Sequence, residues 1–436
     1  MKPIKIGIAG MGTVASGVVK VLERNQAEIT RRAGRGIEVA VVCERTPGRA
    51  AHLEERGVEV INDLSQLASH PDVDIVVELI GGYEPARSFV LEAIANGKHV
   101  VTANKALLAE HGNEIFQAAQ DKGVTVAFEA AVAGGIPVIK ALREGLSANR
   151  IEWIAGIING TTNFMLTQMR EKGWTCADAL KVAQELGYAE ADPTFDVEGV
   201  DAAHKITLMS SLAFGVPINF KAASIEGISK LAASDISYAE KFGYRIKLLG
   251  VTKRTPEGIE LRVHPTLIPE HQLIANVNGV MNAVMIKGDA VGSTLYYGAG
   301  AGSEPTGSSV VADLIDVTRL HTADPEHRVP HLAFQPNALE NIPILPLSAV
   351  QTRYYLRLTV KDQKGVLADV TRILADLNIS VDAMLQTEVD DARKEAQIVV
   401  MTHICKEADV DAACQQIMAL ASVTGDVVKL RVEELN

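Results

Sequence analysis

Five acidic side chains lie between Glu190 and Asp201, shortly before a lysine, Lys205. Asp201 and Lys205 are four residues apart, so a helix that begins near Asp201 would place the carboxylate and the ammonium on one face. The segment that follows, from Ile206 to Phe214, is largely apolar and is expected to be buried. Such pairs usually lie on the surface and contribute little to stability. At the start of a buried helix, however, a charged pair is better explained by chemistry.

A glycine-containing turn near the start of the sequence has the spacing of a dinucleotide-binding site. Gly10 permits a tight turn, Gly12 lets the backbone approach a pyrophosphate, and Ala15 at the third position allows close helix packing. The helix that follows would direct its first N–H groups toward the phosphates. A scaffold of the same kind without a cofactor is the alternative. The expected cofactor contacts in this turn are Gly10, Met11, Gly12, Thr13 and Val14.

The end of the second expected strand bears on the choice of dinucleotide. Glu44 favours NAD, because a carboxylate there can bind the ribose 2′-hydroxyl. Arg45 favours NADP, because its guanidinium can bind a 2′-phosphate. The two residues are adjacent, so the sequence leaves the choice between NADP and NAD open.

The elements that must position these residues follow a β–α alternation over residues 1–130. Short apolar runs predict strands, and the segments between them predict helices that begin near Val14, Arg49, Arg87 and Glu110. This pattern is typical of a Rossmann-like parallel sheet with helices on both faces. The expected strands are Ile4–Ala9, Glu38–Cys43, Ile75–Leu79, His99–Thr102 and Thr125–Phe128.

The remainder of the chain divides into three parts. Residues 131–325 mix strand-like and helical segments, which predicts an α+β domain. Its closing helix, over 308–320, is expected to pack on the first domain. Residues 326–350 are rich in proline and are expected to form a linker. Residues 351–436 fit a ferredoxin-like βαββαβ pattern, so the fold class is α/β overall.

Composition excludes several classes of protein. The 436 residues carry a formal net charge of −12, which disfavours binding to nucleic acid or to anionic membranes. No segment has the length and apolar character of a membrane span, and the first residues do not resemble a signal peptide. The cysteines lack metal-binding spacing, and we expect free thiols in a reducing cytoplasm. They are Cys43, Cys176, Cys405 and Cys414.

The segment that contains Asp201 and Lys205 resembles the signature of homoserine dehydrogenases. The matching positions are Ala183, Gly187-Tyr188, Asp192-Pro193, Asp196-Val197, Gly199, Asp201 and Lys205. The resemblance implies an NAD(P)-dependent oxidoreductase that interconverts L-aspartate 4-semialdehyde and L-homoserine. This reaction is a step of threonine, methionine and isoleucine biosynthesis. No aspartokinase-like segment precedes the match, so a monofunctional bacterial type is expected.

The resemblance also implies that residues 131–325 form the catalytic and dimerisation domain, and it implies roles for individual residues. Lys205 would donate a proton to the carbonyl oxygen while hydride comes from the nicotinamide, and Asp201 would orient the lysine. Schiff-base catalysis by Lys205 ranks lower, because reduction of an aldehyde needs no imine. The expected substrate contacts are Gly187, Glu190, Asp196 and, in a polar segment that matches the family's active site, Thr162.

Two further segments match the family's cofactor contacts. Thr102-Ala103-Asn104-Lys105 follows an expected strand, so Lys105 lies at the carboxyl end of the sheet, where it would reach cofactor and substrate. Thr102 and Ala103 are expected cofactor contacts as well. A glycine-rich turn at 298–306 is costly unless backbone must approach something closely, and Gly302 is expected to contact the cofactor.

A loop after the last strand of the first domain resembles the family's monovalent-cation site. Glu129, Val132, Gly134 and Ile136 would offer oxygen atoms, mostly backbone carbonyls, to the ion. Such donors suit a hard cation such as Na⁺.

The C-terminal segment resembles an ACT domain, a small regulatory module, through Asp362, Gly365 and the pattern that begins at Asn378. Such domains commonly pair through their sheets and bind amino acids at the seam. An amino-acid effector is therefore expected, with threonine the choice that fits the pathway, together with a homodimer or homotetramer. A dimerisation module without ligand is the alternative. All candidate chemistry lies before residue 307, which predicts that this segment regulates and assembles rather than catalyses.

Two rival functions remain open from the sequence. One is another amino-acid dehydrogenase on the same scaffold, such as a relative of diaminopimelate dehydrogenase, and the signature argues against it. The other is a catalytically inactive metabolite sensor. The joint presence of Lys105, Asp201 and Lys205 argues against a sensor.

Overall fold

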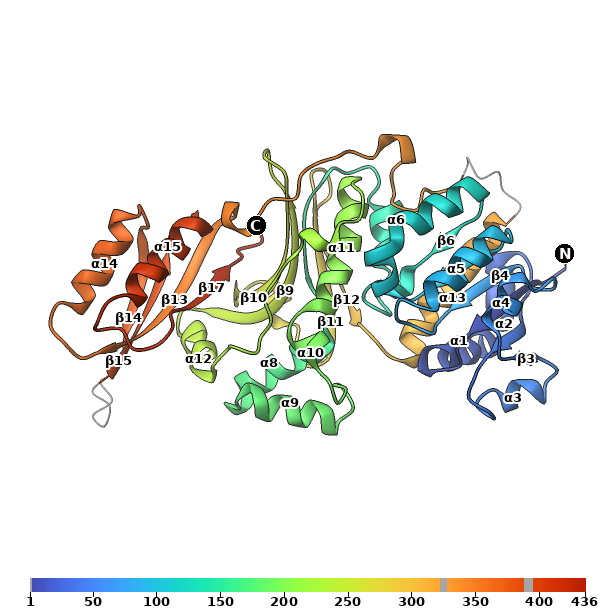
Figure 1. Cartoon of the computed structure of the whole chain (residues 1–436), viewed down its shortest axis with the longest axis horizontal. Coiled ribbons are helices and arrows are strands. Elements are labelled where there is room, and N and C mark those ends of the chain that lie inside the picture. The colour runs from blue at the N-terminus through green and yellow to red at the C-terminus, as the bar shows by residue number, and fades with distance from the viewer. Residues whose placement is uncertain (1, 322–327, 388–394) are drawn as a thin grey trace. The chain divides into compact units, whose positions relative to one another are not determined.

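The computed structural model describes residues 2–321, 328–387 and 395–436 (Figure 1). The chain divides into two compact units. The first unit comprises Met1–Gly160, Asp201–Ala223 and Val280–Ile342. The second unit comprises Thr161–Val200, Ser224–Gly279 and Pro343–Asn436. Each unit is therefore built from segments that are far apart in the sequence.

A six-stranded sheet organises the first unit. Its order is β3–β2–β1–β4–β5–β6, and all neighbours are parallel, as the β–α alternation predicts. The strands are β1 (Ile4–Ala9), β2 (Ile37–Cys43), β3 (Glu59–Ile61), β4 (Ile75–Glu78), β5 (His99–Thr102) and β6 (Val126–Ala127). The helices are α1 (Thr13–Arg24), α2 (Gln26–Ala33), α3 (Ala51–Glu54), α4 (Leu64–Ser69), α5 (Ala86–Ala95) and α6 (Lys105–Lys122). The short elements α2, β3 and α4 were not predicted, because few apolar residues mark their buried faces.

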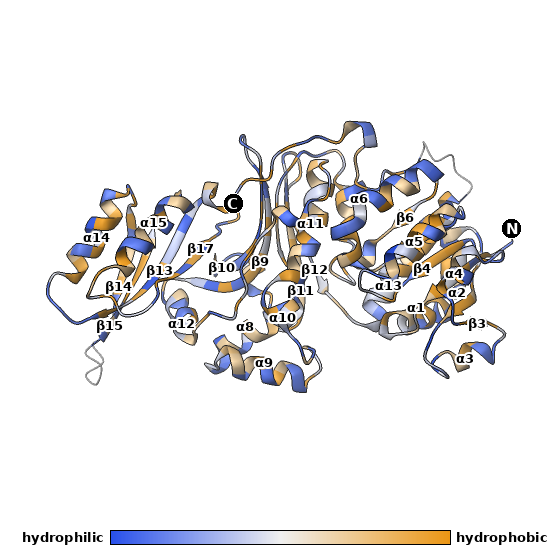
Figure 2. Cartoon of the chain, in the orientation of Figure 1, coloured by the Kyte–Doolittle hydropathy of each residue, from blue (hydrophilic) through white to orange (hydrophobic). Residues whose placement is uncertain are grey.

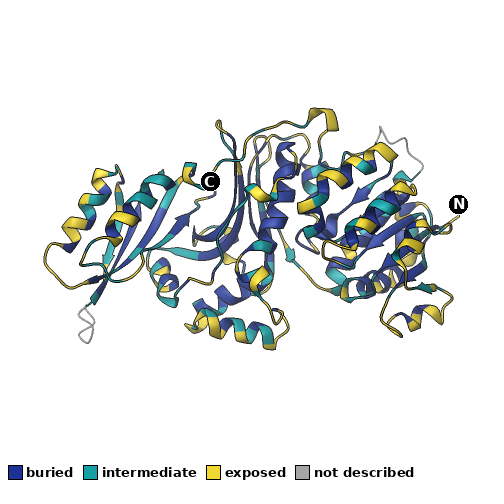
Figure 3. Ribbon diagram, viewed as in Figure 1, coloured by how far each residue is buried: buried dark blue, intermediate teal, exposed yellow. Residues whose placement is uncertain are grey.

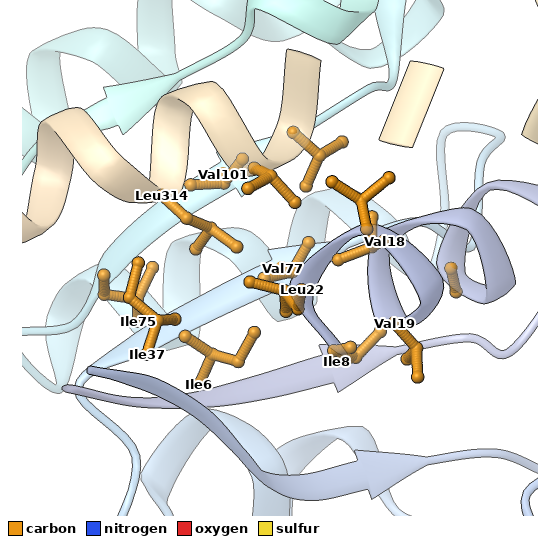
Figure 4. Packing of buried hydrophobic residues seen from close by; sticks show 14 of the residues in the cluster. Ile6, Ile8, Val18, Val19, Leu22, Ile37, Ile75, Val77, Val101 and Leu314 are labelled. Atoms are coloured by element: carbon orange, nitrogen blue, oxygen red, sulfur yellow. The ribbon is translucent and has the colours of Figure 1, made fainter. Parts of the chain in front are cut away.

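An apolar core fills the space between this sheet and two helices, α1 and α13 (Ser303–Leu320) (Figure 4). Apolar residues are concentrated in the strands of the sheet (Figure 2). α13 contains the expected closing helix, and it packs so closely on α1 that a Cβ on Gly17 would lie 1.9 Å from the carbonyl oxygen of Ser303. Core residues that meet here are Ile6, Ile8, Val18, Val77 and Leu314.

Three antiparallel strands and a buried helix complete the first unit. β11 (Met281–Gly288) pairs with β7 (Ile151–Ile157) on one side and with β12 (Gly292–Ala299) on the other. β12 was not predicted, because its side chains are only partly buried and give no apolar run. α11 (Val200–Phe214) is buried along almost its whole length, as expected for the segment around Lys205 (Figure 3). No helix in the described part of the chain is long and apolar enough to cross a membrane.

The second unit combines helices with a mixed sheet. β9 (Tyr244–Arg254) and β10 (Ile259–Pro269) form a long antiparallel pair, and the short β8 (Ser224–Ile225) runs parallel to β10. The helices are α8 (Gly160–Lys172), α9 (Cys176–Glu185), α10 (Thr194–Val197) and α12 (Ala233–Lys241).

The βαββαβ pattern predicted for residues 351–436 is confirmed. The elements are β13 (Gln351–Lys361), α14 (Val366–Asp376), β14 (Val381–Gln386), β15 (Glu395–Thr402), α15 (Glu407–Met418) and β17 (Val428–Val432), with a short β16 (Cys405–Lys406). This segment has its own apolar core. Its last strand, β17, also pairs with β10, with Thr266 opposite Arg431.

Several residues in the described part of the proline-rich segment make specific contacts. In the first unit, the ring of His331 stacks on Phe116 and accepts a hydrogen bond from the Val126 N–H at 3.1 Å. In the second unit, Ile259 exchanges backbone hydrogen bonds of 2.9 and 2.8 Å with residues 343–345. The prolines therefore mark a segment without regular periodicity that is fixed by specific contacts.

Candidate active site

Asp201 lies between two lysine side chains in the first unit. Its Oδ2 accepts a hydrogen bond from Lys205 Nζ at 2.7 Å, and its Oδ1 lies 3.1 Å from Lys105 Nζ. Asp201 and Lys205 are one turn apart on α11, whereas Lys105 is the first residue of α6, which begins shortly after β5. The predicted helix therefore does place carboxylate and ammonium on one face, and the carboxyl end of the sheet supplies the second ammonium.

Two contacts from the end of β7 fix this group. Asn159 Nδ2 donates to Asp201 Oδ2 at 2.9 Å, and Lys205 Nζ donates to the carbonyl oxygen of Ile158 at 2.7 Å. No role for Asn159 was predicted from the sequence. The available signal was its position, a polar residue immediately after a buried strand.

The electrostatics of the group favour an ionised Asp201. Burial alone would raise the pKa of this carboxyl, but the charges of Lys205 and Lys105 and the hydrogen bonds from Lys205 and Asn159 lower it below its usual range. The group thus contains one carboxylate and two ammonium groups, so a net positive charge remains. The side chain of Lys105 is 31% exposed and that of Lys205 is 10% exposed, so the positive charge is accessible from one side. Such a site suits a substrate oxygen on which negative charge develops.

His204 is buried beside the same residues. Burial is the main cause that lowers its pKa to about 4; the lysine charges act in the same direction, and Asp201 opposes them. Its ring packs on Phe220, with 4.3 Å between the ring centroids. The imidazole is therefore neutral near pH 7 and adds no further charge.

The glycine turn after β1 has the shape that a dinucleotide phosphate requires. Gly10 has a φ of +85°, and a Cβ there would lie 3.2 Å from the carbonyl oxygen of Leu79. A Cβ on Gly12 would meet no protein atom within 4 Å, so the space in front of it is open. Thr13 and Val14 form the start of α1, where N–H groups point outward. These residues fit the phosphate groups of the implied cofactor.

A cavity of about 640 Å³ continues from this turn and includes Glu44, Arg45 and Arg49 in its lining. The two carboxylate oxygens of Glu44 accept the N–H groups of Met11 and Thr46, both at 2.8 Å. Burial would raise the pKa of Glu44, but these hydrogen bonds hold it below its usual value. Glu44 therefore braces the glycine turn, while Arg45 and Arg49 present exposed side chains to the cavity. Sequence reasoning missed Arg49, which it read only as the beginning of a helix.

Glu78 is a second residue that the sequence analysis missed. Its carboxylate accepts the backbone N–H groups of 80–81, at 3.0 Å each, and the hydroxyl of Thr102 at 2.6 Å. Burial raises the pKa of Glu78, and these hydrogen bonds oppose the shift. The Thr102 hydroxyl in turn accepts the N–H of Asn104 at 3.0 Å, immediately before Lys105. A charged residue at the end of an apolar strand was the available signal.

The glycine-rich turn lies beside the start of α1. Ser303 Oγ donates to the carbonyl oxygen of Thr13 at 2.7 Å, and Gly302, the residue before it, is exposed with a φ of +130°. Packing within the protein requires glycine at another position of this turn, because a Cβ on Gly300 would lie 1.9 Å from Asn282 Nδ2. Gly302 is thus near the dinucleotide turn, where the sequence placed a cofactor contact.

The expected substrate residues belong to the second unit. Thr161 Oγ1 donates to the carbonyl oxygen of Tyr188 at 2.6 Å, which brings the start of α8, with the buried Thr162, next to Gly187. Glu190 is exposed, and Asp196 is half-buried within α10. The sequence signature is therefore divided, with Asp201 and Lys205 in the first unit and these four residues in the second.

Glu129 occupies a buried loop of the first unit. Its carboxylate accepts the N–H groups of residues 139–140 at 2.9 and 2.8 Å, and the Gly134 carbonyl oxygen accepts the Ser309 hydroxyl at 2.7 Å. Burial and the nearby Asp313 raise the pKa of Glu129 to about 7. Within the described ranges, no three His, Cys, Asp or Glu side chains are arranged to hold a metal ion. A loop of backbone carbonyls with one carboxylate suits a hard monovalent ion.

Three protein-family models match the chain. The model described as homoserine dehydrogenase matches residues 137–315. The model described as homoserine dehydrogenase, NAD binding domain, matches residues 10–129. The ACT domain model matches residues 354–422. The first two matches lie on the two sides of the loop that follows Glu129. Together they include every residue that contacts Asp201 in the arrangement described above.

Individual proteins agree with these models. A homoserine dehydrogenase from Pseudomonas aeruginosa is 61% identical over 436 residues, which is all of both chains. The crystal structure of a homoserine dehydrogenase from Thiobacillus denitrificans is 62% identical, with a TM-score of 0.95 over 100% of this chain and 99% of that one. A hyperthermophilic archaeal homoserine dehydrogenase in complex with NADPH is 26% identical, with a TM-score of 0.62 over 74% of this chain and 99% of that one.

Proposed function

The chain belongs to the homoserine dehydrogenase family, and on that premise we propose that Lys205 is the proton donor when L-aspartate 4-semialdehyde is reduced to L-homoserine. The observation that carries this assignment is the Lys205–Asp201–Lys105 arrangement, in which Asp201 and Lys205 are buried. An ammonium group beside the carbonyl oxygen polarises the carbonyl and then supplies the proton. In the oxidation of homoserine, Lys205 accepts the hydroxyl proton.

Asp201 and Lys105 support this step in different ways. Asp201 orients the Lys205 ammonium and stays ionised, because its pKa is lowered. Asn159 and the Ile158 carbonyl hold the pair in place. Lys105 adds positive charge on the more exposed side, where cofactor and substrate meet. No covalent adduct with the aldehyde is required.

We assign NADP as the preferred cofactor, and its nicotinamide supplies the hydride when bound. Arg45 and Arg49 are the groups that hold a 2′-phosphate, whereas both oxygens of Glu44 already accept backbone N–H groups. The archaeal relative in complex with NADPH supports this choice. The remaining proposed contacts are Gly10, Met11, Gly12, Thr13 and Val14 at the pyrophosphate, with Thr102, Ala103, Lys105 and Gly302.

The substrate carries an amino group and a carboxylate besides the reacting carbon. Glu190 and Asp196 supply negative charge for the ammonium group, and the Gly187 backbone and Thr162 hydroxyl supply hydrogen bonds. The contact between Thr161 and Tyr188 supports this grouping, because it joins two of the segments involved.

Further partners follow from the family and the ACT match. A monovalent cation such as Na⁺ is proposed at Glu129, Val132, Gly134 and Ile136, where it stabilises the loop and takes part in no chemical step. Threonine is the proposed effector of the C-terminal segment, and a homodimer or homotetramer is the proposed assembly. We place the enzyme in the cytoplasm, in keeping with its four cysteines, none of which is in a disulfide.

The direct test follows reduced nicotinamide by absorbance with homoserine and either NADP or NAD. The wild type is expected to oxidise homoserine and to use NADP more efficiently. Lys205→Ala should abolish turnover and leave NADP binding intact, whereas Gly12→Val should prevent binding, because a branched side chain would fill the phosphate path. Normal kcat in Lys205→Ala would show that another group moves the proton.

A further inference from the structure

Arg431 is a fully buried arginine that joins the C-terminal segment to the rest of the second unit. Its guanidinium forms a two-pronged contact with Glu226, with Nη1–Oε2 and Nη2–Oε1 distances of 2.9 and 2.8 Å. On the other side, its Nε donates to Glu407 Oε2 at 2.8 Å. Glu407 also accepts hydrogen bonds from Tyr354, at 2.7 Å, and from Lys429. The guanidinium is therefore fixed by the C-terminal segment and presented to Glu226.

The backbone next to Glu226 contacts the sequence signature directly. The Ile228 N–H donates to the carbonyl oxygen of Val197 at 2.9 Å. A Cβ on Gly227 would lie only 2.4 Å from the same oxygen, so the two chain segments are in close contact. Val197 is the last residue of α10 and follows Asp196, a proposed ligand of the substrate ammonium.

The other edge of this segment is tied to β10. Residues 224–225 pair in parallel with β10, and the Glu226 N–H donates to the Val263 carbonyl oxygen at 2.8 Å. The segment 224–228 therefore has three sets of contacts. Its backbone pairs with β10, the Glu226 carboxylate binds Arg431, and the Ile228 N–H binds the end of α10. The backbone pairing with β10 is a contact that any sequence can make, and the contact with α10 requires the glycine at 227. The third contact depends on one side-chain pair.

We propose that Arg431 is a positioning residue for the reaction, which acts through Glu226 and the segment 226–228 on the end of α10 and so on Asp196. The inference rests on the proposed role of Asp196 at the substrate. It means that the C-terminal segment contributes to homoserine affinity even when no effector is bound.

The surroundings of the Arg431–Glu226 pair also indicate how large the change in substrate affinity should be. Arg431 is already ordered by Glu407, so its contact with Glu226 costs little additional side-chain entropy. The side chain of Glu226 is 40% exposed, and solvent therefore weakens the pair. A change of several-fold in substrate affinity is expected rather than a loss of activity.

The test is Glu226→Gln in the full-length chain. This variant keeps the shape of residue 226 and leaves Arg431 paired with Glu407, so the fold is retained. Glu240→Gln is the matched control, because Glu240 is 38% exposed and pairs with Arg245 in the same unit without contacting the segment 224–228. For each protein, KM for homoserine, KM for NADP, kcat and Tm are measured at a fixed, low salt concentration.

We expect KM for homoserine to rise about fivefold in Glu226→Gln, with kcat and KM for NADP within about twofold of the wild type. Glu240→Gln should match the wild type in all three parameters. An unchanged KM for homoserine, an equal rise in both variants, or a lower Tm without a change in KM would each overturn the inference. If the wild type itself does not oxidise homoserine, the proposed function fails first, and the inference falls with it.

Discussion

Asn159 and Lys205 donate to the same carboxylate oxygen, Asp201 Oδ2, at 2.9 and 2.7 Å. The orientation of the proposed proton donor therefore depends on the end of β7 as well as on its own helix. Removing the charge of Asp201 should affect catalysis more than binding, because the dinucleotide turn is formed by other elements.

Asp201→Asn is expected to lower kcat about 100-fold, since the amide preserves the shape but no longer holds and balances two ammonium groups. KM for NADP should stay within about twofold. Steady-state kinetics with homoserine measure both parameters. A variant with near-normal kcat would show that the carboxylate is only structural.

Arg45→Ala and Arg49→Ala are expected to raise KM for NADP about tenfold each and to leave KM for NAD nearly unchanged, because only NADP carries the 2′-phosphate. Arg32→Ala is the control, since this exposed residue pairs with Glu28 and does not line the cavity. Equal effects on NADP and NAD would place both arginines outside the ribose pocket.

The lowered pKa of His204 should make the free energy of unfolding depend on pH. Its pKa in the folded protein, about 4, lies below the ordinary value of 6.5, so the folded state resists its protonation. Its contribution is fully present above pH 6.5 and is lost as the pH falls toward 4. In His204→Gln the free energy of unfolding should therefore fall less between pH 6.5 and pH 4, by about 2 kcal/mol. Urea titrations across this range measure the difference, and parallel curves for the two proteins would contradict it.

A chain truncated after residue 349 is expected to be unstable. It is not expected to be an active enzyme that has only lost its response to effectors. Removing β17 takes away the strand that pairs with residues 266–267 of β10. It also deprives the buried Asp235 of Arg357 and Tyr355, which are 120 or more residues away in the sequence. Soluble yield and Tm measure the effect. A well-folded truncated enzyme with the Tm of the full-length chain would show that these contacts are dispensable.

Local patterns were sufficient to predict much of the first unit. The parallel sheet follows from alternating apolar runs, and the start of α11 follows from the spacing of Asp201 and Lys205. Both depend on residues close together in the sequence, where period and capping operate. The family resemblance named Lys105, but periodicity alone gave no sign that it meets Asp201.

Residues whose partners are remote in the sequence could not be predicted in the same way. Glu226 and Arg431 are 205 residues apart, and neither has a local pattern that indicates that the two side chains pair. The parallel pairing of β17 with β10 is similarly invisible to periodicity, which identifies strands but not their neighbours. The proline content of residues 326–350 predicted irregular structure, and residues 328–350, which the structure describes, form no long helix or strand. The composition carried no information about contacts such as that of His331.

The close approach of α1 and α13 at Gly17 has a consequence for how the chain reaches its native state. The hydrogen bond between Ser303 and Thr13 closes a loop of 290 residues. Forming such a distant contact is entropically costly and slows folding. The strands that carry the dinucleotide turn therefore emerge from the ribosome long before the helix that covers their apolar face. A nascent chain paused after the sixth strand should expose that face, and it is at this stage that binding by a chaperone is expected.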